Sequence, residues 1–385
     1  MNFCFLLHSL RSDWNHGNAH FVRGVCRDLL RRGHRVRILE PEGAWSLENL
    51  VRDHGPAAAE AYRDAYPELD STTYDASFFD TGLLDDAHVV IVHEWTDPDV
   101  IAACGAWRRS PAGAEAALLF HDTHHRCVSA PEEMTRFDLA GYDAVLAFGG
   151  LIRDWYQAHH DRPAFTWHEA CDPTVFHPRV GVKPERDLVW VGNWGDGERV
   201  AELHEFLIEP VKRLGLSATV HGVRYPDTAL AALEDAGIHY GGYLPNHRVP
   251  GVFARHRLTV HVPRGFYRND LPGIPTIRPF EALACGIPLV SAPWEDAEGL
   301  FDVGRDFLMV DDGETMTQTL RRLLDDPAER ATLAEHGRAT VLDRHTCTHR
   351  VDELIAVLRE LEAGPVDDPL ESPDAAASLP EEVSP

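Results

Sequence analysis

The segment best suited to chemistry is residues 278–291, where an acidic side chain stands beside a turn of defined geometry. Its sequence is Arg-Pro-Phe-Glu-Ala-Leu-Ala-Cys-Gly-Ile-Pro-Leu-Val-Ser. Gly286 suits the left-handed position that ends a helix, and Pro288 stops the helix from resuming, which predicts a short helix followed by a buried strand. Glu281 would then lie in the first helical turn, where negative charge is favoured. There its carboxylate could accept hydrogen bonds from paired hydroxyl groups. An ordinary helix–strand turn is the alternative.

Two further candidate sites follow predicted strands of the N-terminal half, because open α/β sheets bind ligands beyond the carboxyl ends of their strands. After the first strand, Gly17, Asn18 and His20 open a helix whose unpaired N–H groups could hold a diphosphate or an acceptor. A simple capped helix start is the alternative. His93, after the third strand, is a weaker candidate for an acceptor site.

A cluster of polar residues, His-Asp-Thr-His-His-Arg at 121–126, follows the fourth predicted strand. His and Asp are common metal ligands, but the spacing matches no zinc signature and no other His or Cys pair completes one. We therefore expect no metal ion here. A binding role for His121 and Asp122 and a solvated surface cluster both remain open.

A glycine-rich loop in the C-terminal half, residues 189–199, also joins a strand to a helix. Gly192 and Asn193 lie within this loop, and Arg199 begins the helix. Arginine makes bidentate, charge-assisted hydrogen bonds to phosphate oxygens. Arg199 is therefore the first candidate to hold a diphosphate, and Arg264, after a later strand, is the second. An arginine on a helix surface is the alternative in each case.

The elements that must position these residues form two alternating series of strands and helices. In the first half, with a helix at 18–32, strands are expected at 2–7, 36–39, 88–92, 116–120 and 143–148. In the second half, with helices at 198–214, 229–236 and 313–324, strands are expected at 187–191, 217–221, 258–262, 287–291 and 307–310. Such alternation predicts an α/β fold with parallel, doubly wound sheets. Residues 41–80 could form helices over the first sheet, and the proline-containing segment 171–178 suits an interdomain linker.

Length and charge limit the class of function. A chain of 385 residues is too long for one core and suits two domains of ordinary size. The formal charge of −26, from 36 basic and 62 acidic residues, argues against nucleic acid as a partner. The phosphates of a nucleotide would have to be met locally by arginines and helix N-termini.

Cysteine usage and hydropathy favour the cytoplasm. Seven scattered cysteines without a Cys-x-x-Cys pair indicate reduced thiols. No apolar run has the length of a membrane span, and the first residues lack the basic region of a signal peptide. We therefore expect a cytoplasmic protein with no integral membrane segment.

Several motifs occur together in a characteristic order. They are Gly-Asn-Ala-His with a downstream Arg-Gly in the first helix, Val-Gly-Asn-Trp, Ile-Arg-Pro-Phe-Glu, and His-Thr-Cys-Thr-His-Arg at 345–350. In this order the chain resembles the glycosyltransferases related to spore-maturation protein CgeB, a branch near the retaining family 4 transferases. The resemblance covers most of residues 1–360 and is strongest over 187–352. It implies a GT-B fold, in which two Rossmann-like domains face one another across a cleft.

The resemblance also implies a division of labour along the chain. Residues 1–172 would form the acceptor-binding domain and residues 179–345 the nucleotide-sugar donor domain. Residues 346–362 would form a helix that packs back toward the first domain. Residues 363–385, acidic and rich in Pro and Ala, are expected to be disordered.

The implied activity, of the hexosyltransferase type, moves a sugar from a nucleotide-diphosphate donor to a hydroxyl of a small-molecule or glycan acceptor. Neither a metal ion nor another cofactor is expected, because arginines would neutralise the diphosphate. Glu281, with Arg278 beside it, would hold the ribose. His121 would face the donor sugar with Asp122 orienting it, and Arg199 and Arg264 would stabilise the departing diphosphate.

One departure from the family leaves the stereochemical outcome open. Many family 4 enzymes carry two glutamates separated by seven residues, and the first of them falls here at Gly273. Asp270, or the backbone N–H groups of Gly273 and Ile274, could contact the sugar instead. Two other functions therefore remain, a GT-B nucleotide-sugar epimerase and a non-catalytic binder of sugars or nucleotides.

Overall fold

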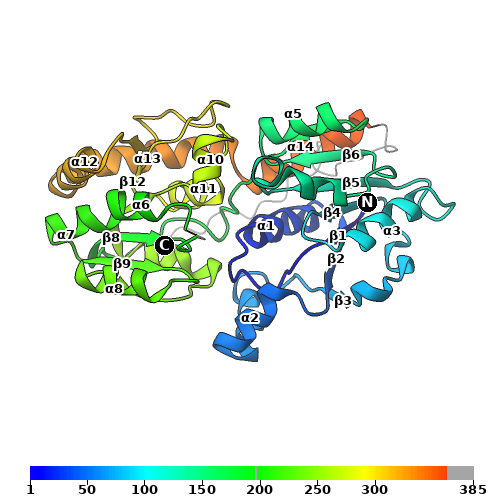
Figure 1. Ribbon diagram of the computed structural model, residues 1–385, viewed down its shortest axis with the longest axis horizontal. Helices are drawn as coiled ribbons and strands as arrows, with labels where there is room; N and C mark the ends of the chain where they lie inside the picture. Colours follow the sequence, from blue (N-terminus) through cyan, green and yellow to red (C-terminus); the bar gives the residue numbers. More distant parts are fainter. Residues whose placement is uncertain (196, 362–385) are drawn as a thin grey trace, which may run out of the picture.

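The computed structural model describes residues 1–195 and 197–361, which form two sheets with helices packed around each (Figure 1). In every strand pair of these residues the two strands run parallel. The predicted α/β class with doubly wound parallel sheets is confirmed. The predicted acidic tail lies outside the described residues.

The first sheet has the strand order β3-β2-β1-β4-β5-β6-β7. Its strands are β1 (Asn2–Leu6), β2 (Arg35–Pro41), β3 (Thr72–Tyr74), β4 (Val89–His93), β5 (Ala117–Asp122), β6 (Ala144–Ala147) and β7 (Ala164–Thr166). The connecting helices are α1 (Asn18–Arg31), α2 (Trp45–His54), α3 (Pro98–Arg108), α4 (Arg126–Ser129) and α5 (Gly150–His159). Short 3₁₀ segments lie at Pro56–Asp64, Ala76–Phe78, Thr81–Leu84 and Pro131–Arg136.

The second sheet has the order β10-β9-β8-β11-β12-β13. Its strands are β8 (Arg186–Val191), β9 (Ala218–His221), β10 (His239–Tyr240), β11 (His256–His261), β12 (Leu289–Ser291) and β13 (Leu308–Met309). Its helices are α6 (Val200–Leu203), α7 (Glu209–Leu214), α8 (Asp227–Asp235), α9 (Val249–Phe253), α10 (Gly265–Asn269), α11 (Ile277–Ala284), α12 (Gly313–Asp325) and α13 (Pro327–Arg344). A π-helical turn at His204–Ile208 joins α6 to α7, and a 3₁₀ turn at Asn246–Arg248 precedes α9.

Continuous apolar runs form these strands because both faces of each sheet are covered. In β1, Phe3 and Phe5 pack into the core on one face, whereas Cys4 and Leu6 pack into the core on the other. A strand buried on both sides needs no polar alternation, which is typical of parallel sheets. All seven cysteines are buried and unpaired.

The chain crosses between the two sheets twice, and the crossings lie side by side. Cys171 and Thr346 form an isolated parallel bridge, in which the Cys347 N–H donates to the Cys171 carbonyl at 2.8 Å. Thr346 caps helix α14 (Cys347–Glu360), with His349 completing a capping box. The helix then packs against α1 of the first sheet's layer, where a Cβ on Gly24 would collide with the Cys347 sulfur.

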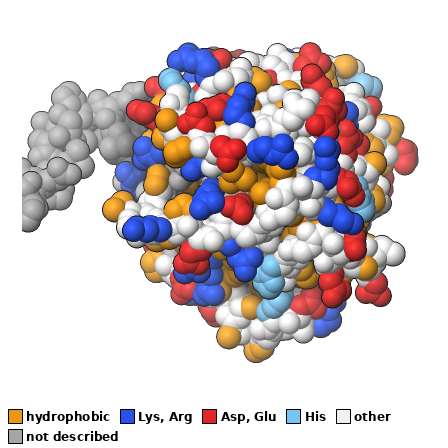
Figure 2. Space-filling view, turned by 90° about the vertical axis from the view of Figure 1, so that its left-hand side faces the viewer, with side chains coloured by type: hydrophobic (Ala, Val, Ile, Leu, Met, Phe, Trp, Pro, Cys, Tyr) orange, Lys and Arg blue, Asp and Glu red, His pale blue; other side chains and the backbone are white. Residues whose placement is uncertain are grey.

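On the face of the molecule nearest to α7, α8 and α12, acidic and basic side chains are mixed irregularly with hydrophobic ones (Figure 2). None of the described helices is both long enough and apolar enough to cross a lipid bilayer.

Candidate functional site

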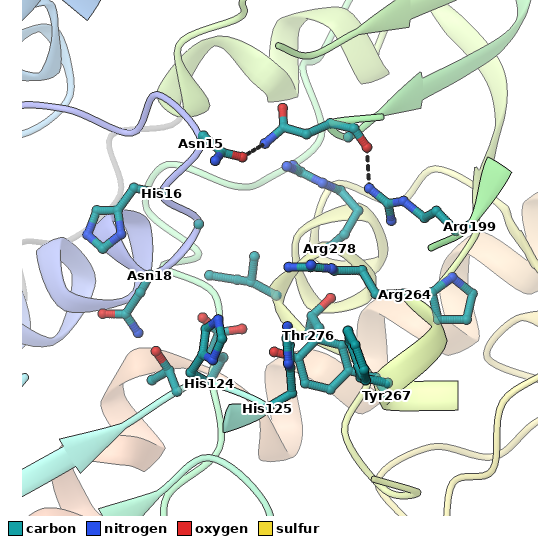
Figure 3. A pocket seen from close by; sticks show the side chains of 18 of the residues that line it. Asn15, His16, Asn18, His124, His125, Arg199, Arg264, Tyr267, Thr276 and Arg278 are labelled. Atoms are coloured by element: carbon teal, nitrogen blue, oxygen red, sulfur yellow. Dashed lines mark hydrogen bonds between the residues drawn. The ribbon is translucent and has the colours of Figure 1, made fainter. Parts of the chain in front are cut away.

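The main cavity lies where the strand order reverses in both sheets. The order changes direction between β1 and β4 in the first sheet and between β8 and β11 in the second. Loops that follow these strands line a cavity of about 1030 Å³ between the two halves (Figure 3). Ligands of doubly wound folds bind at such reversals, beyond the carboxyl ends of the strands. The cavity is therefore the candidate active site.

The wall contributed by the second half is basic. Arg199 follows β8, and it donates to the Val262 carbonyl at 2.9 Å and to the Asn193 carbonyl. Its guanidinium also lies 5.3 Å from the centre of the Trp190 ring, and its Nε–H has no hydrogen-bond partner among the described residues. Burial, and then the nearby Arg264, lower the pKa of Arg199 to about 10, so the side chain remains charged at neutral pH.

Two further arginines reach the cavity, each with a carboxylate partner. Arg264, at the N-terminus of α10, pairs with Glu198, and Arg278, in the first turn of α11, pairs with Glu281. Figure 3 shows Arg199, Arg264 and Arg278 extending into the same space from the side of the second sheet. With Arg224, these three arginines are the only residues of the described lining that carry a fixed positive charge.

The N-terminal end of α11 also borders the cavity. Thr276, Ile277 and Arg278 are part of the lining, and Thr276 has φ +61° and ψ −177°, a conformation rare for a residue with a Cβ. Backbone strain of this kind costs of order 1–3 kcal/mol and clusters at functional sites. Gly17 faces this end of the helix, since a Cβ there would be 3.8 Å from Ile277 Cγ2. A helix N-terminus attracts anions through its free N–H groups.

The wall contributed by the first half is aromatic and uncharged. His16, His124 and His125 lie on this wall (Figure 3), and His125 stacks on Phe266 of the second half at 4.3 Å between ring centres. Burial lowers the pKa of His124 to about 2 and that of His125 to about 4, and it holds the pKa of His16 well below the usual range. The three imidazoles are therefore neutral at physiological pH. The rest of this wall is Trp14, Asn15, Gly17, Asn18, Trp45, Asn49, Trp95, Thr123, Ser129 and Phe148.

Glu169 supplies a carboxyl group within the lining. It precedes the crossing at Cys171 and is 6 % exposed. Burial, and then the nearby Glu281, raise the pKa of Glu169 to about 8, while Asn18 and Arg278 oppose the shift. At pH 7 the group is mostly protonated, so it can donate a hydrogen bond or a proton into the cavity.

Contacts at two places join the halves around this cavity. Glu298, after β12, accepts from the Gly150 N–H at 2.7 Å and pairs with His168 Nε2 at 2.9 Å. Asp13, in the loop after β1, accepts from the Tyr243 hydroxyl and from the Asn246 N–H at 3.3 Å. The site is thus enclosed by groups from both sheets.

The structure brings half of the sequence-predicted site residues to the cavity. Those that line it are Gly17, Asn18, Gly192, Asn193, Arg199, Arg264 and Arg278. Those that do not line it are His20, His93, His121, Asp122, Gly273, Ile274 and Glu281.

The position predicted for Glu281 was wrong. Because α11 begins at Ile277, Glu281 lies beyond the first turn, and its side chain is fully buried. Its oxygens already accept from Asn246 Nδ2 at 2.9 Å and from Arg278. Burial raises its pKa to about 7 against the opposing effect of Arg278. Glu281 therefore supports Arg278 from beneath the cavity and does not face it.

The arrangement predicted for His121 and Asp122 also differs from the structure. Successive side chains of a strand point to opposite faces, so Asp122 cannot orient His121. Asp122 instead accepts from the Tyr156 hydroxyl at 2.7 Å and from the His124 N–H at 2.9 Å. His121 lies in the opposite core layer, 4.9 Å from Trp167 between ring centres.

Two other predicted histidines are buried as well. His93 lies 5.3 Å from His121, ring to ring, and bonds Thr123 at 3.1 Å. His20 packs against Phe176 at 4.2 Å between ring centres. Both are about 1 % exposed, so neither reaches a ligand in the cavity.

The loop around Gly273 forms part of the contact between the two halves of the molecule. Gly273 has φ +94°, and its N–H donates to the Glu295 carbonyl at 2.7 Å, so it is not available to a sugar. Ile274 is buried in the core of the first half, and Asp270 is exposed outside the lining. A glutamate at position 273 would meet Glu298 Cγ at 2.8 Å from its Cβ.

Several residues that line the cavity were not predicted from the sequence. Trp95 comes two residues after β4, Trp45 comes soon after β2, and His124 and His125 belong to the polar cluster already identified, so a search beyond the strand ends could have found them. Glu169 carried no such signal, because it lies on the segment between the sheets. Among the described residues no group of three or more His, Cys, Asp or Glu side chains could hold a metal ion.

Residues 199–356, under half of the chain, match a protein family described as glycosyl transferase-like. No curated protein matches the sequence. Solved structures match over nearly their full length. Sucrose-phosphate synthase from Thermosynechococcus elongatus has 12% identity and a TM-score of 0.63, with 94% of this chain and 99% of that chain covered.

Two other solved structures were determined with nucleotides bound. HepE from Anabaena, in complex with UDP-glucose, has 14% identity and a TM-score of 0.63, with 94% of this chain and 100% of that chain covered. TarM from S. aureus, in complex with UDP among other ligands, has 9% identity and a TM-score of 0.66, with 92% and 99% covered. Likeness at these identities shows the fold, which is GT-B.

Proposed function

We propose that the protein is a glycosyltransferase that moves a sugar from a nucleotide-diphosphate donor to an acceptor hydroxyl. The observation that carries this proposal is the convergence of Arg199, Arg264 and Arg278 with the N-terminus of α11 on one wall of the interdomain cavity. Such a wall is suited to a diphosphate, and the opposite wall has the neutral polar groups that suit hydroxyls. The glycosyl transferase-like match over residues 199–356 supports the same activity.

The donor binds to the half formed by residues 179–345, and the acceptor to residues 1–172. Charge that develops on the departing diphosphate is stabilised by the fixed arginines, because preorganised charge in a water-poor site is the largest catalytic contribution in most enzymes. Arg199 and Arg264 supply this charge without a metal ion. Arg278 is held in place by Glu281, which takes a positioning role.

Two finer assignments rest on the sequence. The branch related to CgeB near family 4 rests on the sequence resemblance, and a cytoplasmic setting rests on the dispersed cysteines. The stereochemistry of transfer, retaining or inverting, is to be measured on the product, because Gly273 replaces the first of the two glutamates that many family 4 enzymes share.

The first test is a thermal-shift screen with UDP, GDP, dTDP and ADP, because a ligand at 100 times its dissociation constant stabilises by about 2.7 kcal/mol. The nucleotide with the largest shift then identifies the sugar donors to be assayed for transfer. Absence of a shift with all four, together with no nucleotide release from any donor, would overturn the proposal.

The second test replaces the first-ranked arginine. Arg199→Ala is expected to lower kcat for transfer by about a hundredfold, while the affinity for the bare nucleoside changes by less than about twofold. The matched control is Arg213→Ala, since Arg213 is an exposed arginine of α7 that pairs with Glu314 away from the cavity. Equal kcat in Arg199→Ala and the control would remove Arg199 from the mechanism.

Nucleotide-sugar epimerisation is a second candidate function, and Glu169 is the observation that favours it. An epimerase needs a carboxyl group able to exchange protons with the sugar, and Glu169 lines the cavity with a raised pKa. Incubation with the nucleotide sugar alone separates the two functions. Conversion of the donor without an acceptor would support the epimerase, and dependence on an acceptor supports the transferase.

A further inference from the structure

The two walls of the cavity differ in charge, and this difference bears on the second substrate. Four arginines stand on the wall of the second half, at 199, 224, 264 and 278. Among the described lining residues contributed by residues 1–148 there is no Asp, Glu, Lys or Arg. An ion placed against that wall would lose its hydration without gaining a partner, which is costly.

Two tryptophans on the uncharged wall form an aromatic corner, defined here as Trp45 and Trp95. Their ring centres lie 6.0 Å apart, and the ring planes meet at 70°. Both side chains are partly exposed in the cavity lining. They come from different elements, since Trp45 begins α2 and Trp95 follows β4.

Each ring of the aromatic corner is held by a buried neighbour. His8 packs on Trp45 at 4.7 Å between ring centres, with 33° between the planes. The Arg126 guanidinium lies 5.2 Å from the centre of the Trp95 ring, and its charge is paired with Glu94 at 2.7 Å. The rings are therefore fixed before a ligand arrives, and binding orders few side chains.

Polar groups share the cavity lining with the aromatic corner without adding charge. They are Asn18, Asn49, Thr123 and Ser129, whose side chains can donate and accept hydrogen bonds, and His124, a neutral imidazole 5.4 Å from the Trp95 ring between centres. A ligand that fits has a flat C–H face for the tryptophans and hydroxyls along its edge. A pyranose ring has this combination, whereas a planar aromatic alcohol has too few hydroxyls for the polar groups.

We infer that the acceptor is an uncharged sugar, whose ring packs on the aromatic corner of Trp45 and Trp95. This inference rests on the proposed glycosyltransferase function and names the class of its second substrate. The cavity of about 1030 Å³ is at the upper end of the range for a single small ligand, so it has room for a donor and a second sugar.

The experiment measures binding of candidate acceptors to the full chain loaded with the nucleotide from the thermal-shift screen. Quenching of tryptophan fluorescence is followed with glucose and maltose, with glucose 6-phosphate and glucuronate as charged counterparts, and with 4-methylumbelliferone as a planar aromatic alcohol. The neutral sugars are expected to bind at least about tenfold more tightly than either charged counterpart. Tighter binding of a charged sugar or of the aromatic alcohol would overturn the inference, as would no binding of any of the five.

Variants then locate the sugar. Trp45→Ala and Trp95→Ala are expected to raise the dissociation constant of the neutral sugar by about tenfold. Phenylalanine at the same positions is expected to keep most of the wild-type affinity, because it retains an aromatic face. The dissociation constant of the nucleotide is the second readout, because a variant that merely fails to fold would weaken both ligands. Trp155→Ala, on α5 outside the lining, is the control. Equal sugar affinity in all variants would overturn the inference while leaving nucleotide binding, and so the proposed function, intact.

Discussion

Replacing Glu169 by glutamine tests whether a neutral carboxyl group stands in the cavity. Burial raises the pKa of Glu169 from 4.5 to about 8. In the folded protein the carboxyl therefore keeps its proton over a range of pH in which the unfolded chain has lost it. Its contribution to stability is complete below about pH 4.5 and is lost progressively as the pH rises toward about 8.

The size of the effect follows from linkage. Each pH unit between the two pKa values costs the folded state about 1.4 kcal/mol. From about pH 5.5 to 7.5, wild type should lose roughly 2–3 kcal/mol of unfolding free energy relative to Glu169→Gln, which cannot ionise. The buried histidines are present in both proteins, so the difference between the two curves reports the ionisation of Glu169 together with its coupling to Glu281.

The measurement is urea unfolding of wild type and Glu169→Gln at several pH values in that range. Glu314→Gln is the control, because hydrogen bonds from Gln318 and Arg213 lower the pKa of Glu314 and no histidine pairs with it. A carboxylate with a lowered pKa loses its stabilising effect only at acid pH, so this control should show no added slope. A constant difference between wild type and Glu169→Gln across the range would refute the raised pKa.

Two predictions concern residues whose roles the structure changed. Glu281→Ala should destabilise the fold by about 3–5 kcal/mol in urea unfolding, since it leaves Arg278 and Asn246 without their buried partner; a loss below about 1 kcal/mol would contradict this positioning role. Gly273→Glu should lower the thermal midpoint, because φ +94° is costly for a residue with a Cβ and Glu298 occupies the space. An unchanged midpoint with higher transfer activity would instead show that a second glutamate can be accommodated there.

The sequence predicted the fold well because buried parallel strands have a strong signal. All ten expected strands are present, and Gly286 ends α11 with φ +67° as expected. The missed strands β3, β7 and β10 are two or three residues long and pair only at sheet ends. The π-helical turn at His204–Ile208 was also hidden, because apolar periodicity does not distinguish it from an α-helix.

The site was predicted only in part, because polar side chains near a strand end do not reveal which way they point. Arg199 and Arg264 come from loops that must face the strand reversal, so their position follows from topology. His121 and Asp122 are the last residues of β5 itself, where alternation sends one side chain into each core layer. The prediction for Glu281 failed because α11 begins at Ile277, earlier than expected. Glu281 is therefore in the second turn of the helix, where its side chain points into the interior.

The return of α14 to the first sheet has a consequence for how the protein is made. Helix α1 leaves the ribosome long before the partner that packs over Gly24, which begins at Cys347. The strands and helices that lie between α1 and α14 in the chain must therefore be synthesised before this surface of α1 is covered. Until α14 arrives, the N-terminal half keeps an open apolar surface on α1, so its folding is completed only when that helix docks.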